Sequence, residues 1–370
     1  MSELSADLTD VSPVHPAGSL SWLILLALAV GGFGIGTGEF VIMGLMPTIA
    51  ADLAVTEPQV GHVISSYALG VVVGAPILAI FGARLYRRHL LLLLMVFFAL
   101  GNLASALAPD YHSLLLARFV AGLPHGAYFG VAALVAASLV APNKRAAAVS
   151  LVMLGLTLAI LLGNPLATLL GQQIDWRYAF VAVAVIALLT VLLIALFLPL
   201  DRGVVRSNPL AELQAFRRIQ VWYALGIGAI GFAGMFCVFS YLAVTLLEVT
   251  GVTPLVVPLA VATFGAGTLL GNLAGGWLFE RLQFAAVGVV LLWSIGVLLL
   301  FPFAVQTLWS ALLAAFLVGT MVALPPPMQT RGSPTGPAAC CSSTRPNRRS
   351  IPVRISAPTA CPRPPRSSCR

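Results

Sequence analysis

The chain has 370 residues, of which 59% are hydrophobic and only 9% are charged, and its mean hydropathy is +1.00. Soluble domains carry about 25% charged residues, so this composition excludes a soluble protein and predicts an all-α, polytopic membrane protein. The net charge of +8 comes from basic residues scattered over short loops and not grouped with aromatic residues, which argues against nucleic acid as a partner.

Apolar runs of about twenty residues, long enough to cross a lipid bilayer, recur along the chain. The segment before the first run contains acidic residues but no Lys or Arg, and the run is too long for a signal peptide, so we expect it to be retained behind a cytoplasmic tail at 1–19. We predict about ten membrane-spanning helices, at 22–46, 58–80, 91–109, 113–140, 146–170, 178–199, 221–246, 254–279, 285–304 and 307–324.

Basic residues predict the orientation of these helices. The loops after even-numbered spans hold eleven Lys and Arg, namely Arg84, Arg87, Arg88, Lys144, Arg145, Arg202, Arg206, Arg217, Arg218, Arg281 and Arg331. The opposite loops hold Arg177 alone, together with several carboxylates. Because basic loops stay in the cytoplasm, we expect both termini there and the protein in a plasma membrane, of the bacterial inner-membrane type.

The longest polar connection, at 200–220, follows the sixth span and divides the chain. It predicts an N-terminal six-helix bundle at 20–199, a cytoplasmic linker, and an incomplete four-helix bundle at 221–331. The turn at 79–88, after the second span, is similar to the turn at 276–282, after the eighth. Two halves built from one repeat are typical of secondary transporters, whose binding site lies between the halves.

Glu39 is the only carboxylate inside the long apolar runs. A carboxylate at the middle of a membrane helix costs roughly 2.5 to 3.5 kcal/mol, so this position predicts a proton or substrate site. Arg118, in the fourth span, lies at a similar depth when 1.5 Å per residue is counted along each helix. Two interpretations stay open: Glu39 exchanges a proton as a cavity alternates between the two faces, or the two residues form a static pair that fixes the packing of the first and fourth helices.

Three motifs carry a resemblance to a known family over roughly residues 20–331. They are Gly38-Glu39-Phe40-Val41-Ile42-Met43-Gly44-Leu45-Met46-Pro47 with Ile49-Ala50-Ala51-Asp52-Leu53, then Arg118-Phe119-Val120-Ala121-Gly122-Leu123-Pro124-His125-Gly126-Ala127, then Gly155 and Gly163-Asn164-Pro165 followed by Gly171 and Trp176-Arg177. The chain resembles the major facilitator superfamily, in particular its proton-coupled drug-efflux branch, close to arabinose-efflux and chloramphenicol-resistance permeases. The resemblance implies a two-bundle fold, with twelve helices in the intact family, and alternating-access efflux of small hydrophobic drugs or sugars by a monomer.

The resemblance also supplies candidate site residues. Proton coupling falls to Glu39 and Arg118. The candidate substrate-cavity residues are His125, Asn102, Asn164, Phe236, Phe239 and Tyr241. The candidate gating residues are Arg84, Arg87, Arg88, Gly276, Glu280 and Arg281, with Ala83 in the place of the usual Asp, which weakens the N-terminal copy of that motif. For the histidine, the amides and the aromatic residues, hydrogen bonding or packing within the bundle is the alternative.

Gly155, Gly163 and Gly171 recur every eight residues, which places them on roughly one helix face, and Pro165 predicts a kink. Small residues on such a face let a neighbouring helix approach closely. In the resembling exporters this antiporter motif joins the two halves.

The chain changes character after Arg331. Residues 332–370 contain no acidic residue, no Leu and no Phe, but seven Arg and four of the five cysteines. Such a composition predicts a disordered basic tail. Because the family has twelve spans, we expect a shifted reading frame near Arg331, and a truncated product that does not transport is then the alternative function.

Enzymatic function is the rival class. The five histidines show no metal-ligand spacing, and the chain has no phosphate-cradling loop of the Walker type. We therefore predict no catalytic activity, no metal and no cofactor, with a small-molecule substrate, the proton and the lipid bilayer as partners.

Overall fold

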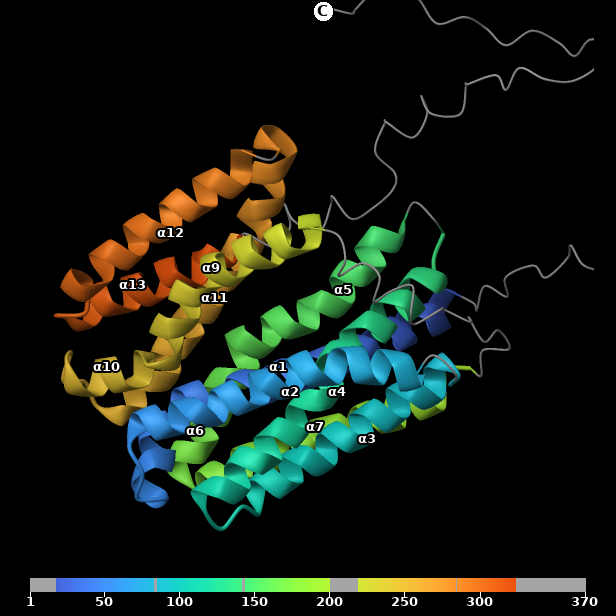
Figure 1. Ribbon diagram of the computed structural model, residues 1–370, viewed down its shortest axis with the longest axis horizontal. Coiled ribbons are helices and arrows are strands. Elements are labelled where there is room, and N and C mark those ends of the chain that lie inside the picture. Colours follow the sequence, from blue (N-terminus) through green and yellow to red (C-terminus); the bar gives the residue numbers. More distant parts are fainter. Residues whose placement is uncertain (1–17, 83–84, 142–143, 200–218, 284, 324–370) are drawn as a thin grey trace, which may run out of the picture. The chain divides into compact units, whose positions relative to one another are not determined.

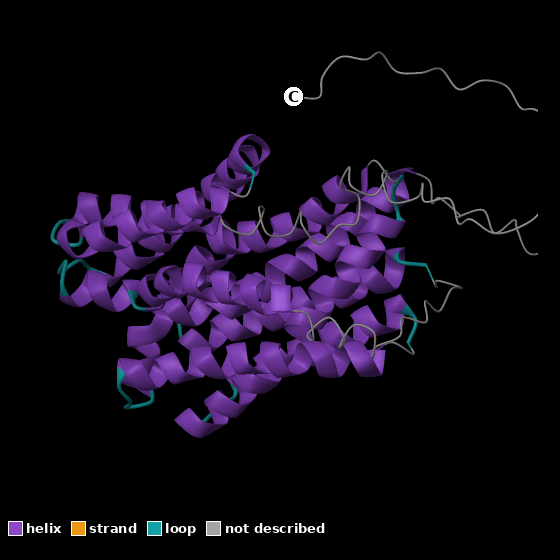
Figure 2. Ribbon diagram, turned by 45° about the horizontal axis from the view of Figure 1, so that its top comes forward, coloured by secondary structure: helices purple, strands orange, loops and turns teal. Residues whose placement is uncertain are grey.

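The computed structural model describes residues 18–82, 85–141, 144–199, 219–283 and 285–323, and the regular elements within these ranges are all helices (Figures 1 and 2). The first half contains α1 (Gly18–Asp52), α2 (Glu57–Gly82), α3 (Arg87–Ala106), α4 (Tyr111–Ser138), α5 (Arg145–Leu158), the π-helix η2 (Ala159–Gly163), α6 (Asn164–Gln173) and α7 (Trp176–Phe197). The second half contains α9 (Ile219–Ser240), α10 (Leu242–Glu248), the 3-10 helix η4 (Pro254–Val256), α11 (Val257–Leu282), α12 (Ala285–Ala304), α13 (Leu308–Thr320) and the 3-10 helix η5 (Met321–Ala323).

Nine helical segments of the described residues are long and apolar enough to cross a membrane, which confirms nine of the ten predicted spans. The fifth span consists of α5, η2 and α6 in one continuous segment, and the seventh is interrupted at Tyr241, between α9 and α10. The tenth, predicted at 307–324, is shorter than expected: α13 ends at Thr320 and η5 adds three residues. The predicted tails at 1–19 and 332–370 and the linker at 200–220 lie almost wholly outside the described residues.

Two aspartates begin helices at the same end of the molecule. The Asp110 carboxylate accepts a hydrogen bond of 3.0 Å from the backbone N–H of Ser113, and the Ser113 hydroxyl accepts one of 3.2 Å from the backbone N–H of Asp110. This capping box satisfies N–H groups that have no partner inside α4. The hydrogen bond from Ser113 lowers the pKa of Asp110. Asp175 caps α7, because its carboxylate accepts a hydrogen bond of 2.8 Å from the backbone N–H of Arg177.

The two halves repeat one close helix contact. In the first half α2 packs on α4, and in the second half α11 packs on α13. At each contact a Cβ added to a glycine would collide with the backbone of the facing helix; these glycines are Gly70, Gly74 and Gly122 in the first half and Gly267, Gly271 and Gly319 in the second. The three corresponding pairs share one offset of 197 positions, which is also the offset between the similar turns that begin at Ala79 and Gly276. The packing thus supports the predicted internal repeat.

One buried apolar cluster joins the two halves. It is formed mainly by residues of α9 to α13, but it includes Phe40 and Met43 of α1 and Ile160 of η2. Further along, Gly265 of α11 lies against Leu161, and Asn272 of α11 donates a hydrogen bond of 3.4 Å to the Thr157 hydroxyl of α5. The first half therefore meets the second through α1 and through the segment from α5 to α6.

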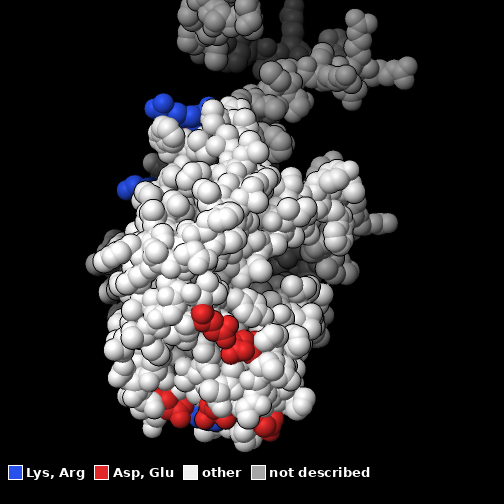
Figure 3. Space-filling view, turned by 90° about the vertical axis from the view of Figure 1, so that its left-hand side faces the viewer, with Lys and Arg blue, Asp and Glu red and all other residues white. Residues whose placement is uncertain are grey.

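Charged side chains lie mainly at the two ends of the helices. Figure 3 shows acidic side chains gathered on the end at which α10 lies in Figure 1. The described carboxylates of these turns are Asp52, Glu57, Asp110, Asp175 and Glu248, and the described basic residues at the opposite helix ends are Arg87, Arg88, Lys144, Arg145 and Arg281. The orientation of the helices across the membrane was predicted from this separation of acidic and basic residues. Which end faces the cytoplasm stays a prediction.

Candidate functional site

Arg118 is fully buried in α4, and neutral groups surround its guanidinium. Its Nη2 donates a hydrogen bond of 2.7 Å to the carbonyl of Gly38, and its Nη1 donates one of 3.4 Å to the Asn102 side-chain oxygen. The guanidinium carbon lies 4.2 Å from the centre of the Tyr67 ring and 5.4 Å from that of the Phe180 ring. Carbonyl dipoles and aromatic faces thus stabilise the buried cation, because both present negative charge to it.

Glycines bring these partners together. Gly38 has no Cβ, and one added there would lie 2.9 Å from Phe98 and 3.0 Å from Val183, so a larger residue would push α1 away from Arg118. Gly122, one turn after Arg118, lies against the backbone of Tyr67. The close approach of α2 and α4 at this point places the Tyr67 ring over the guanidinium.

Glu39, the residue after Gly38, points to a different neighbour. The nearest ion-pair partner of its carboxylate among the described residues is His125, with Oε2 4.0 Å from Nδ1, whereas no charged atom of Arg118 comes within 4.0 Å of it. The same His125 Nδ1 is hydrogen-bonded to the Tyr67 hydroxyl at 3.0 Å. Arg118 and Glu39 therefore lie at one depth without a direct ion pair, and Tyr67 and His125 lie between them.

A cavity of about 490 Å³ opens beside this group, between α1, α2 and α9. Glu39 and Tyr67 line it on one side, and the side chain of Glu39 is 22% exposed. The opposite wall carries Phe236, Cys237 and Tyr241, and the hydroxyls of Ser65 and Ser240 also reach the cavity. A volume of this size holds a small organic molecule. Cys237, an exposed free thiol, lies in the wall of that cavity.

The structure separates the six residues predicted for the substrate cavity. Phe236 and Tyr241 line the cavity, and His125 contacts it through Tyr67 and Glu39. Phe239 is buried behind the wall, where its ring stacks on Phe264 with centres 3.7 Å apart.

Neither of the two predicted amides lines the cavity. Asn102 is buried beside Arg118. Asn164 is buried on α6. Both side chains are buried between helices of the first half and do not reach the cavity.

The predicted gating residues do not form a joint cluster. Arg88 Nη2 donates a hydrogen bond of 2.7 Å to the carbonyl of Ala195, which ties the start of α3 to the end of α7. Arg281 lies over the Trp277 ring at 4.7 Å, and Glu280 is exposed. Of the other gating residues, Arg87 is half-buried at the start of α3, Gly276 has open space around its Cβ position, and Arg84 lies outside the described residues.

The antiporter-motif glycines contact α1 of their own half. Gly155 lies against Ala29, Gly163 against Phe33 and Thr37, and Gly171 against Leu45. The absence of a side chain at each of these positions lets the helices approach closely, and the atoms nearest to all three glycines belong to the first half. The faces of η2 and α5 turned towards α11 carry Ile160, Leu161 and Thr157 instead. Pro165 is the second residue of α6, directly after the π-helix.

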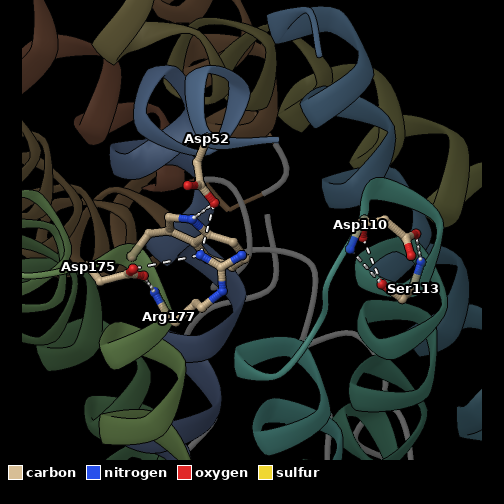
Figure 4. Close-up of polar contacts among 6 residues, drawn as sticks. Asp52, Asp110, Ser113, Asp175 and Arg177 are labelled. Atoms are coloured by element: carbon tan, nitrogen blue, oxygen red, sulfur yellow. Dashed lines mark hydrogen bonds and ion pairs between the residues drawn. The ribbon is translucent and has the colours of Figure 1, made fainter. Parts of the chain in front are cut away.

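The sequence analysis missed one polar cluster, at the ends of α1 and α7 (Figure 4). Asp52 Oδ2 accepts hydrogen bonds of 2.9 Å from Trp176 Nε1 and 2.9 Å from Arg177 Nη1. Arg177 also lies 3.7 Å from the Asp175 carboxylate and stacks on the Trp176 ring at 4.3 Å. The signal was present, since Asp52 and Trp176-Arg177 end two of the motifs, but their facing positions cannot be read from separate motifs.

Among the described residues no three His, Cys, Asp or Glu side chains lie close enough together to hold a metal ion.

A family model described as Major Facilitator Superfamily matches residues 28–349, most of the chain. The chain belongs to the major facilitator superfamily. The matched region extends past Arg331, into the part for which a shifted reading frame is predicted. Membership of this superfamily makes the chain a multi-pass membrane protein and a secondary transporter.

Curated relatives agree with the family assignment. The inner membrane transport protein YdhP of Escherichia coli (strain K12) is 40% identical over 310 residues, which cover 83% of this chain and 79% of YdhP. The chloramphenicol resistance protein of Streptomyces lividans is 34% identical over 263 residues, which cover 70% of this chain and 67% of that protein. By name, one of these relatives is a transport protein and the other a resistance protein.

Solved structures of the superfamily share the fold. The chain is similar to a bacterial homologue of the human lysosomal transporter Spinster, with a TM-score of 0.66, 21% identity, and coverage of 81% of this chain and 72% of that one. The likeness confirms the predicted all-α, major-facilitator-type two-bundle fold.

Proposed function

We propose that this major facilitator is a proton-coupled exporter of small, mainly apolar molecules, which acts as a monomer in the inner membrane of a bacterium. The observation that carries the proposal is the position of Glu39: it is the only carboxylate of the described residues that lies away from the helix ends, and it lines the cavity. A carboxylate in a membrane interior is retained where it does work, such as carrying a proton.

The partners of Arg118 support this role for Glu39. Because the guanidinium is stabilised by the Gly38 carbonyl, Asn102 and the Tyr67 ring, no ion pair with Glu39 is needed to hold α1 against α4. The Glu39 carboxylate is therefore available to gain and lose a proton where the cavity meets water. His125 and Tyr67 form a short hydrogen-bonded extension of the same site. This favours the proton-exchange interpretation over the static pair.

The cavity wall supports an apolar substrate. Phe236 stacks on Phe40 with ring centres 6.1 Å apart. The cavity surface that includes Phe236 and Tyr241 is mostly apolar. The chloramphenicol resistance protein among the relatives gives a first probe, since chloramphenicol combines an aromatic ring with hydroxyl groups. The hydroxyls of Ser65, Ser240 and Tyr241 favour sugars as a second substrate class.

Cys237 allows binding to be tested separately from transport. In a chain whose other cysteines, Cys340, Cys341, Cys361 and Cys369, are replaced by Ser, we expect chloramphenicol to slow maleimide labelling of Cys237. Glu39→Gln should keep this protection but abolish efflux driven by a pH gradient in proteoliposomes. The matched control is Glu248→Gln, at the exposed end of α10, which should retain both activities.

Two results would count against the proposal. Efflux by Glu39→Gln that still follows the pH gradient would exclude Glu39 as the proton carrier. Protection of Cys237 without efflux in the unmodified chain would favour the alternative, a truncated product that binds but does not transport.

A further inference from the structure

The hydroxyl of Tyr67 finds one hydrogen-bonding partner among the described residues. Tyr67 is 2% exposed, and its hydroxyl oxygen lies 3.0 Å from Nδ1 of His125. A buried phenol O–H without an acceptor loses its solvation and gains nothing in return, so Tyr67 donates to this nitrogen. A ring nitrogen that accepts carries no proton, and a neutral imidazole then carries its proton on Nε2. The geometry therefore gives His125 one tautomer, with a lone pair on Nδ1.

The distance between His125 and Glu39 agrees with that tautomer. Glu39 Oε2 lies 4.0 Å from the same Nδ1, which is beyond hydrogen-bonding range. A proton on Nδ1 would draw the carboxylate to about 2.8 Å, because hydrogen bonds to charged groups are short. The longer separation is that of a carboxylate that faces a lone pair. Tyr67 thus occupies the atom of His125 that would otherwise bond to Glu39.

Helix packing holds the imidazole ring in this position. The rings of Tyr67 and Phe129 flank it, with centres 5.9 Å and 5.3 Å from the centre of the His125 ring. Gly122 of α4 lies against the backbone of Tyr67, which brings α2 and α4 close together at this level. The phenol and the imidazole therefore face each other across a contact between two helices and not through a loop.

The second half shows that the fold does not need this hydroxyl. At the offset of 197 positions that relates the two halves, Tyr67 corresponds to Phe264 and His125 to Val322. Phe264 is 1% exposed, and its ring stacks on Phe239 with centres 3.7 Å apart. A phenylalanine thus fills the corresponding place in a packed core. Packing accounts for an aromatic ring at position 67, whereas the hydroxyl and its acceptor occur in the half that contains Glu39.

We infer that Tyr67 is a positioning residue, whose hydroxyl holds His125 in the Nε2–H tautomer and thereby denies Glu39 a hydrogen bond from the ring. This inference rests on the proposed function, in which Glu39 carries the proton. A carboxylate that accepts a hydrogen bond from an N–H is stabilised in its charged form and takes up a proton less readily. Tyr67 keeps Glu39 free of that bond, so Glu39 exchanges its proton with the cavity and His125 stays neutral.

Few other titratable groups surround the imidazole ring. The titratable and charged groups that share its surroundings are Arg118 on α4 itself, Glu39 on α1, Tyr67 and His62 on α2, and Cys237 and Tyr241 across the cavity. The described titratable residues of α3 and α5 stand at the starts of these helices. Among the described residues Glu39 is the only acid within 4.0 Å of the ring, so a change of tautomer acts on Glu39 first.

Nitrogen NMR reports the tautomer of His125 directly, in the full chain with isotope-labelled histidine rings in lipid nanodiscs. At neutral pH we expect an unprotonated Nδ1 and a protonated Nε2, and we expect Tyr67→Phe to move the proton to Nδ1, where it bonds to Glu39. The matched control is Tyr128→Phe, which removes another buried phenol, one whose hydroxyl donates to the Leu28 carbonyl at 2.8 Å. This control should leave the His125 signals unchanged, and His125→Phe identifies those signals by their loss.

The pH profile of efflux gives a second readout, which a purely structural role would not move. In proteoliposomes we expect Tyr67→Phe to shift the acid limb of the chloramphenicol efflux profile by about one pH unit towards acid, because the new bond from His125 stabilises charged Glu39. In a His125→Phe background the same change should cause no shift, since no imidazole is left to bond. Tyr128→Phe should keep the profile of the unmodified chain.

Four results would overturn the inference. A proton on Nδ1 of His125 in the unmodified chain, or an unchanged tautomer in Tyr67→Phe, would show that the hydroxyl does not control the ring. Slower efflux by Tyr67→Phe without a shift of the profile would leave Tyr67 a packing role alone. An equal shift in the His125→Phe background would mean that Tyr67 acts on Glu39 without the histidine. The NMR measurement does not depend on transport, so a failure of the proposed function, seen as coupled efflux by Glu39→Gln, is distinguishable from a failure at Tyr67.

Discussion

Two arginines of the first half hold helices together in opposite ways. Arg177, at the half-exposed end of α7, is neutralised by carboxylates, with Asp52 at 2.9 Å and Asp175 at 3.7 Å. Arg118, fully buried in α4, has no carboxylate within 4.0 Å among the described residues and is stabilised by the Gly38 carbonyl, an amide and two rings. A pair in water is held by opposite charges that solvent weakens. A buried cation held by dipoles leaves the nearby Glu39 available for chemistry.

The largest effect that this comparison predicts is at Arg118. Arg118→Lys keeps the charge but loses the forked geometry that reaches Gly38 and Asn102 together. Loss of one hydrogen bond to a charged group costs roughly 1.5 to 3 kcal/mol, so we expect efflux to fall by about tenfold or more. The matched control, Arg177→Lys, should change efflux by less than about twofold. Equal losses in proteoliposome efflux would show that burial makes no difference between the two arginines.

A smaller effect is expected at the exposed pair. Asp52→Asn removes the charge that Arg177 contacts but leaves an oxygen for Trp176 Nε1. With both charged groups partly in water, the free energy of unfolding should fall by less than about 1 kcal/mol. The difference should vanish in about 1 M salt, where the screening length is only about 3 Å. Thermal melting at low and high salt measures this, and a loss that persists at high salt would mean that the pair is not governed by screened charge.

The smallest effect concerns Asp110, the fully exposed cap of α4. Its pKa is lowered in the folded protein by the N–H of Ser113, so its charge stabilises the fold above the ordinary aspartate pKa of about 4. That contribution is lost as the pH falls through the lowered folded pKa. Asp110→Asn keeps a capping oxygen without a titrating group, so the difference in Tm between the two proteins should shrink on acidification. If the difference in Tm instead grew as the pH fell, the ionised Asp110 carboxylate would not stabilise the fold.

Much of the fold could be predicted, because a membrane helix must be apolar over its whole length. Nine spans, the close glycine contacts and the common depth of Glu39 and Arg118 follow from run length, residue size and rise per residue. Pro165 marks the fifth span as irregular, but neither the π-helix η2 nor the break at Tyr241 could be predicted, because hydropathy does not register a change in helix winding.

The partners in the site were harder to predict than the positions. Depth follows from counting residues, but the rotation of a helix about its axis decides whether Arg118 meets the Glu39 carboxylate or the Gly38 carbonyl. Tyr67 and Phe180 gave no signal, since aromatic residues are common in apolar spans. Asn164 was singled out as polar, but only the structure shows that it is buried away from the cavity.

The π-helix η2 explains why glycines eight residues apart face the same helix. In a regular α-helix eight residues advance about 80° beyond two full turns, which would rotate Gly163 away from the side that Gly155 occupies. A π turn absorbs one extra residue without turning the helix that follows, so both glycines contact α1 at Phe33. Gly171 follows eight residues of regular helix and has drifted towards Trp176 of α7. Loss of one codon within 159–163 should therefore preserve the faces of α5 and α6, whereas the same loss within α6 would turn every later residue of the helix by about 100°.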